Sequence, residues 1–160
     1  MTFLLNEPII VALVARLQAD LPAQIAAVNA RTTDGIQITM PGEILDFIPP
    51  PGVLTSYPTI GIGDAPAKFE DDIGSSATGV FEILIVVYEQ AGDQRELAWK
   101  LRRASQAVTS VALAGRQLGP GWGVTLREVS PGPTLGDDAE NPQEWMSWVG
   151  VRIVVKTDEE

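Results

Sequence analysis

Carboxylates are the residues of this chain best suited to chemistry, because the sequence contains neither histidine nor cysteine. Apart from the solvated tail Asp158–Glu160, they are densest in two runs, Glu70–Asp72 and Asp137–Glu140. Carboxylate oxygens are preferred ligands of Mg²⁺ and Ca²⁺, but neither run has the spacing of a calcium-binding loop. We therefore interpret both runs as solvated loops and expect no bound metal. Two separate acidic loops that meet at one cation are the alternative.

The remaining candidates for catalysis or cofactor binding lack the partners that such sites need. Without histidine, the commonest general base and zinc ligand are missing. The serines within Gly74–Gly79 do not have the Gly-x-Ser-x-Gly spacing of a nucleophile elbow. Gly61–Gly63 is followed by neither the third glycine nor the helix of a dinucleotide-binding loop. We expect no enzyme activity and no cofactor.

The elements that position these residues are organised around the segment Gly79–Ala114. Its first part, Gly79–Glu89, predicts a strand with two mainly apolar faces, which is typical of a strand covered on both sides. Either helices cover one face and another subunit covers the second, or the strand is fully interior. Asp93 and Glu96 then form a capping-box-like pair at the start of a helix that continues to Ala114. One apolar stripe runs along that helix, formed by Leu97, Leu101, Ala104, Val108 and Val111.

The rest of the chain predicts one more helix and several strands. The helix starts at Asn6, ends near residues 29–32, and is kinked or restarted by Pro22. Alternating apolar residues predict strands over 36–40, 57–63, 122–127 and 145–155. Irregular segments are expected at 41–57, 64–78 and 130–144, the second as an exposed loop or a protruding hairpin tip. We predict one α+β domain over residues 1–160, with a mainly antiparallel sheet of four to five strands and two helices on one face.

The clearest surface feature is an uneven distribution of charge. The net charge is −10, which disfavours nucleic-acid binding. Of the 11 basic residues, five lie on or beside the helix after the central strand. We predict a subunit interface in which this basic helix meets acidic loops, formed by Arg95, Lys100, Arg102, Arg103, Glu70, Asp71 and Asp72. A solvated helix face is the plainer alternative, and contact with DNA is a weaker one.

No membrane association is expected. The longest early apolar run, Ile9–Ala15, is far shorter than the roughly 20 residues that a spanning helix needs. The residues before it include Glu7 but no Lys or Arg, which disfavours a signal peptide. We therefore expect an intracellular protein.

The order and size of these elements resemble the tail terminator (tail-completion, minor tail U-like) proteins of long-tailed bacteriophages. The resemblance covers most of the chain and lies in topology rather than in a diagnostic motif. The matching segments are Pro8–Leu21, Tyr57–Ile62, Phe81–Tyr88, Asp93–Ala114, Val124–Val129 and Trp148–Val155. Two segments have no match in that family, the proline-rich Pro49–Gly52 and the long Ser130–Glu144.

What the resemblance implies is a homo-oligomeric ring, usually of six subunits, at the head–tail joint of a virion. Such a ring is assembled in the host cytoplasm, ends polymerisation of the tail-tube protein and joins the tail to the head-side connector protein. DNA would pass through its pore without specific binding, because an acidic pore repels DNA. Three alternatives remain: another ring-forming phage connector or neck protein, a non-catalytic cytosolic binding module, and a metal-dependent hydrolase that uses only Asp and Glu.

Overall fold

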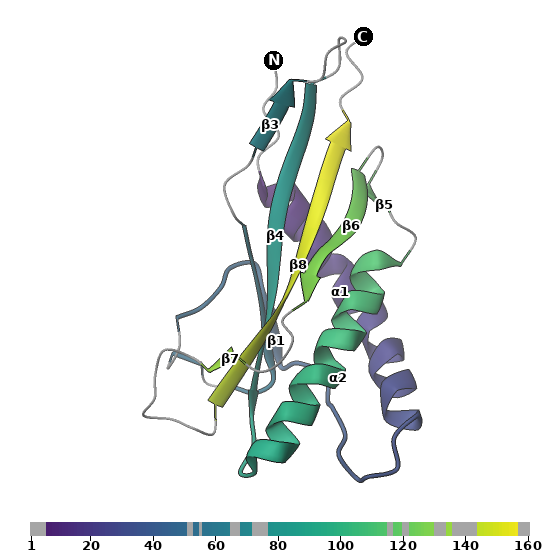
Figure 1. Ribbon diagram of the computed structural model, residues 1–160, viewed down its shortest axis with the longest axis vertical. Helices are drawn as coiled ribbons and strands as arrows, with labels where there is room; N and C mark the ends of the chain where they lie inside the picture. Colours follow the sequence, from purple (N-terminus) through teal and green to yellow (C-terminus); the bar gives the residue numbers. More distant parts are fainter. Residues whose placement is uncertain are drawn as a thin grey trace.

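The protein is an α+β fold in which two helices pack against one face of a single sheet (Figure 1). The computed structural model describes residues 6–50, 53–54, 56–64, 68–71, 77–114, 117–119, 122–129, 134–135 and 144–156. The helices are α1 (Asn6–Ala30) and α2 (Gln94–Leu113). The long strands are β2 (Thr59–Asp64), β4 (Ala77–Gln90), β6 (Trp122–Val129) and β8 (Glu144–Lys156). The short strands are β1 (Glu43–Leu45), β3 (Lys68–Asp71), β5 (Gln117–Gly119) and β7 (Thr134–Leu135).

The sheet is built on the long antiparallel pair β4 and β8, whose register runs from Thr78 opposite Lys156 to Gln90 opposite Glu144. The strand order is β1-β2-β4-β8-β6-β5, with β3 added beside β4 and β7 beside β8. Among the strands of the described residues, only β1 and β2 pair in parallel. The predicted fold class is therefore confirmed. Four long strands form the centre of the sheet, and four short ones extend it.

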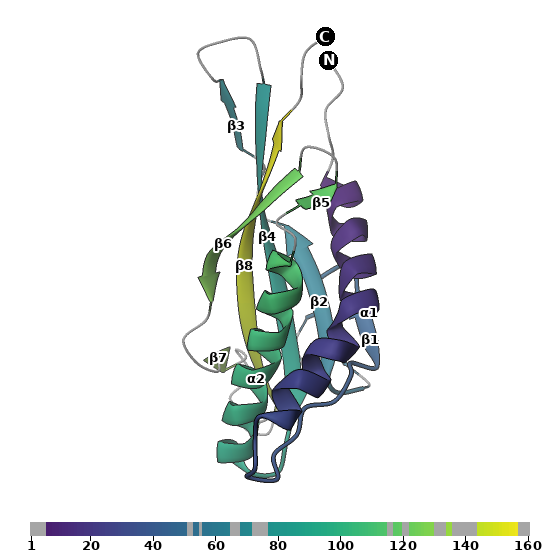
Figure 2. The ribbon, with the colours of Figure 1, turned by 90° about the vertical axis from the view of Figure 1, so that its right-hand side faces the viewer.

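The core lies between the helices and one face of the sheet (Figure 2). Inward residues of β4 pair with inward residues of β2 and β8, so Ile85 lies opposite both Ile62 and Val149. All three side chains are fully buried. The predicted stripe of α2 packs here, and Ser105 hydrogen-bonds Ser147 of β8 at 2.6 Å inside the interface. Apolar residues recur at every second position in the strands and at every third or fourth position in α2, so each element turns one apolar face towards this core.

The other face of β2 and β4 is covered in part by the chain itself. Strand β2 presents Gly61 and Gly63 on that face, and the segment 47–49 lies against them. The hydroxyl group of Tyr88 donates a 2.9 Å hydrogen bond to the carbonyl oxygen of Pro49. Farther along β4, Leu84 is only half-buried. The second face of β4 is therefore covered by the chain itself over one part and partly exposed over another. This lies between the two predicted alternatives, a fully interior strand and a face left for another subunit.

One predicted strand is wrong. Residues 36–40 have no regular secondary structure, although Ile38 is buried as their alternation predicts. The side chain of Asn29 takes the place of a neighbouring strand. Its Oδ1 accepts a 3.0 Å hydrogen bond from the Ile38 N–H group, and its Nδ2 donates a 2.8 Å bond to the Ile38 carbonyl oxygen. Because one amide satisfies both backbone groups, the segment needs no strand partner.

The three segments predicted as irregular each contain a short strand. Strand β1 lies in 41–57, β3 in 64–78 and β7 in 130–144. Of the two alternatives for 64–78, the structure shows the hairpin, since β3 pairs antiparallel with the start of β4. Strands of two to four residues carry too little alternation to be visible in a sequence.

Helix α1 continues through Pro22 as one helix of 25 residues. Figure 2 shows its axis changing direction along its length, as a proline inside a helix predicts. By length and composition, Glu7–Ala30 could cross a membrane, so the expectation that no such segment exists is wrong. The expectation counted only an unbroken apolar run. Within this fold Leu13, Leu17 and Leu21 of α1 are buried in the core, as in the core helix of a globular protein.

Candidate assembly surface

The predicted basic helix exists and has a well-defined start. Asp93 is the N-cap of α2, and its Oδ1 accepts a 2.9 Å hydrogen bond from the Arg95 backbone N–H group. The side chain of Glu96 forms an i,i+4 ion pair with Lys100 at 3.3 Å. Among the hydrogen bonds of the described residues, it does not make the reciprocal bond to the N-cap that the capping-box pattern predicts. The charge of Lys100 is therefore balanced within α2. Arg95 and Arg102 remain exposed on the surface.

Trp99 lies between these basic residues and was not singled out by the sequence. Its side chain is 37% exposed, and the guanidinium group of Arg102 lies 5.2 Å from its ring centroid. The spacing of Arg95, Trp99 and Arg102 places them on one face of α2. We call these three residues the Trp99 patch. Trp and Arg are the residues most enriched at energetic hot spots of protein interfaces.

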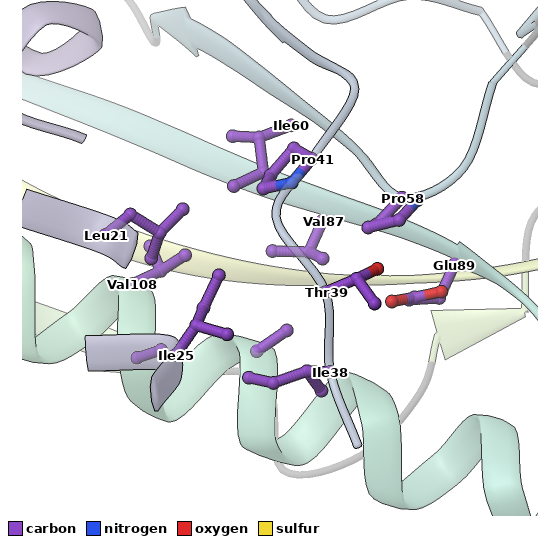
Figure 3. Close-up of a pocket in the computed structure, with 12 residues that line it drawn as sticks. Leu21, Ile25, Ile38, Thr39, Pro41, Pro58, Ile60, Val87, Glu89 and Val108 are labelled. Carbon is purple, nitrogen blue, oxygen red and sulfur yellow. The ribbon is translucent and has the colours of Figure 1, made fainter. Parts of the chain in front are cut away.

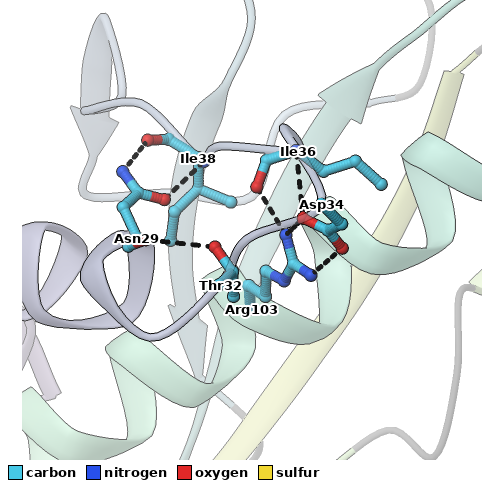
Figure 4. A network of polar contacts seen from close by, with 6 residues as sticks. All are labelled: Asn29, Thr32, Asp34, Ile36, Ile38 and Arg103. Atoms are coloured by element: carbon cyan, nitrogen blue, oxygen red, sulfur yellow. Dashed lines mark hydrogen bonds and ion pairs between the residues drawn. The ribbon is translucent and has the colours of Figure 1, made fainter.

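Arg103, the fourth predicted basic residue, is buried and paired within the chain (Figure 4). Its Nη1 donates a 3.1 Å hydrogen bond to Oδ1 of Asp34 and a second bond to the carbonyl oxygen of Ile36, and its Nη2 donates to Oδ2 of Asp34. Gly35, with φ of 78°, forms the tight turn between the two acceptors. Arg103 therefore joins the loop after α1 to α2.

The electrostatics of this pair follow from its geometry. The bidentate guanidinium group of Arg103 lowers the pKa of the Asp34 carboxyl group below its usual value, and the Ile36 N–H group lowers it further. Elsewhere, burial raises the pKa of Glu89, although Lys100 partly offsets this effect. Glu89 lines a cavity of about 10 Å³ among Leu21, Ile25 and Ile38 (Figure 3). That volume is close to the smallest that holds one water, so the cavity is a packing defect and not a ligand pocket.

The acidic half of the predicted interface is only partly placed. Glu70 and Asp71 lie in β3, opposite Thr78 and Ala77 of β4. Asp72 lies outside the described residues, as does the run 137–140. Within the part of the chain that the structure describes, no cluster of three or more His, Cys, Asp or Glu residues could hold a metal ion. The metal and enzyme expectations stay predictions.

A second surface was missed by the sequence. Between α1 and β1 lies an open groove of about 400 Å³, which we call the α1–β1 groove. It is lined by Val11, Val14, Ala15, Gln18, Ile44, Leu45 and Asp46. Val11 in the groove wall is 54% exposed, and Phe47, the residue after Asp46, is 53% exposed. The sequence places these residues in a helix and in an irregular segment. Their meeting depends on β1, which was not predicted.

No protein-family model and no curated protein matches the chain. Its fold is similar to that of a chain in a solved structure described as the virion of a native gene transfer agent particle. The two share 17% sequence identity with a TM-score of 0.52, and the match covers 91% of this chain and 98% of the other. Nearly the whole of that chain therefore has the same arrangement of two helices and a mainly antiparallel sheet.

Proposed function

We propose that this protein is a structural component of a phage-like virion and acts through assembly with other copies of itself and with neighbouring virion proteins. The observation that carries this proposal is the fold match to a chain of a virion particle over almost the full length of both chains. The Trp99 patch, the α1–β1 groove and the half-buried Leu84 support it. A protein that works by assembly needs such surfaces, since contiguous exposed apolar areas mark interaction sites.

Within that class, we propose the tail terminator as the specific role. The protein would form a ring at the head–tail joint. The ring would end growth of the tail tube and join the tube to the head-side connector protein. The order of elements that resembles this family supports the proposal. The net charge of −10 supports it too, because an acidic pore would let DNA pass without binding. Another ring-forming neck protein is the alternative.

The terminator role predicts an effect on tube growth. Tail-tube subunits of the same particle are allowed to polymerise with and without this protein, and tube lengths are measured by electron microscopy. We expect shorter tubes with a ring bound at one end, because a bound ring blocks further addition. Bovine serum albumin at equal concentration serves as the acidic control. Rings that form but leave tube length unchanged would favour the other neck protein.

A further inference from the structure

We propose that the Trp99 patch of one copy docks into the α1–β1 groove of the next copy, and that this contact builds the ring. The inference rests on the proposed function and adds to it the two surfaces that meet. It replaces the acidic run Glu70–Asp72 with the groove as the partner of the basic helix. Each copy carries both surfaces on different elements, so the contact is head-to-tail, the type that closes into a ring when the rotation permits.

The shape and polarity of the groove fit an aromatic side chain. Its walls are mainly aliphatic, with Val11 and Val14 from α1 and Ile44 from β1. It is open to solvent, and its volume of about 400 Å³ leaves room for an aromatic ring. Six large hydrophobic residues are exposed among those described, and two of them, Phe47 and Trp99, are aromatic. Phe47 directly follows the groove residue Asp46, so Trp99 is the exposed aromatic residue on an element away from the groove. Its ring is therefore the exposed group best suited to fill an apolar groove.

The charges around the two surfaces are complementary. Asp46 lines the groove, and Glu43, the first residue of β1, is exposed. No Lys or Arg is among the groove residues. The Trp99 patch carries Arg95 and Arg102, both exposed, while Lys100 is already paired with Glu96. Opposite charges therefore favour contact between the patch of one copy and the groove of the next. Like charges oppose contact between two grooves or between two patches.

The position of the groove also suits a repeated contact. Strand β1 is at one end of the strand order, and α1 lies between it and α2. The two surfaces therefore do not overlap, and one copy can use both at the same time. A membrane would need a basic or broadly apolar surface rather than a groove with acidic residues. A second copy supplies the basic aromatic partner without any further protein.

Cross-linking between copies tests this arrangement, and the absence of native cysteine makes the readout specific. Two single variants are mixed, Ala15→Cys in the groove and Gln106→Cys on the same face of α2 as Trp99. A short bismaleimide then joins only thiols on adjacent copies. Ala26→Cys is the matched control for Ala15→Cys, since both alanines are exposed on α1 and lie about 16 Å apart along the helix. We expect a high yield with Ala15→Cys and little with Ala26→Cys.

Substitutions in the contact test its energetics. We expect Trp99→Ala to weaken assembly by about thirtyfold, which is typical of a hot-spot residue. Asp46→Lys and Arg102→Asp should each weaken assembly, and the two combined in one chain should restore it, because the charge pair is then reversed rather than removed. Circular dichroism of each variant checks that the fold is kept.

The outcomes separate this inference from the proposed function. If rings form but cross-linking is equal at the two α1 positions, the proposed contact is wrong. The same holds if assembly is not restored in the doubly substituted chain. In both cases the proposal that the protein forms a ring still stands. A protein that stays monomeric at every concentration overturns the proposed function, and the contact with it.

Discussion

Gly61→Ala is expected to lower the free energy of unfolding by about 1–3 kcal/mol, the usual cost of overpacking a well-packed site. A Cβ atom at this position would lie 2.7 Å from the carbonyl oxygen of Phe47 and 2.9 Å from Cδ of Pro49. These atoms belong to the backbone and to a rigid ring, so the whole segment 47–49 would have to move. That movement would also break the hydrogen bond from Tyr88 to Pro49. Urea unfolding followed by tryptophan fluorescence measures the loss.

Gly63→Ala is the matched control on the same strand and the same face. Its Cβ atom would approach 2.4 Å from Cδ1 and 2.6 Å from Cγ1 of Ile48. These atoms are at the far end of a side chain that is 38% exposed and can rotate away. We expect a change within about 0.5 kcal/mol, as for most surface substitutions. Equal losses at the two glycines would contradict the close packing of segment 47–49 on β2.

Arg103→Met is expected to destabilise the fold at neutral pH and to have a smaller effect in acid. Its hydrogen bond to the Ile36 carbonyl oxygen has a charged donor, the class that contributes about 1.5–3 kcal/mol. Methionine keeps most of the apolar stem but donates no hydrogen bond. Arg102→Met is the control, since Arg102 is the exposed neighbour on the same helix. Its effect on stability should stay within about 0.5 kcal/mol.

The pH dependence of Arg103→Met follows from Asp34. The pKa of Asp34 in the folded protein is lowered below its ordinary value of 3.8, so the contribution of the pair to stability is fully present above that pH. As the pH falls below 3.8 towards the lower folded pKa, Asp34 becomes protonated and the contribution of the pair is lost. The difference between wild type and Arg103→Met should therefore shrink in this acid range. Thermal unfolding at pH 7 and at pH 3 measures it, and a difference that grows in acid would contradict the pairing.

The central layer of the fold could be predicted because its patterns are long. Strand β4 is a long run that is apolar on both faces, β8 alternates along most of its length, and α2 has a cap and a stripe. Residues 36–40 were wrongly predicted as a strand. The alternation of apolar residues indicates that Ile38 is buried, but it does not indicate which group hydrogen-bonds to the Ile38 backbone. The Asn29 side chain that does so lies nine residues away. Short strands such as β1 form only because longer neighbours are already in place.

The assembly surface was harder to predict for the same reason. Helical spacing correctly placed Arg95 and Arg102 on the surface, and the same reasoning left Arg103 there as well. Its burial depends on Asp34, which is 69 residues away in the sequence and is brought close only by the packing of α1 on α2. The α1–β1 groove likewise joins distant segments. Contacts of this kind have no local signature in a sequence.

The mass of the protein in solution across a range of concentrations tests the central claim most directly. The subunit mass is 17.1 kDa. Sedimentation velocity should show a species of about six subunit masses that grows with concentration, as expected for a closed ring, and negative-stain microscopy should show an annulus. A single species at the subunit mass over the whole range would contradict the account.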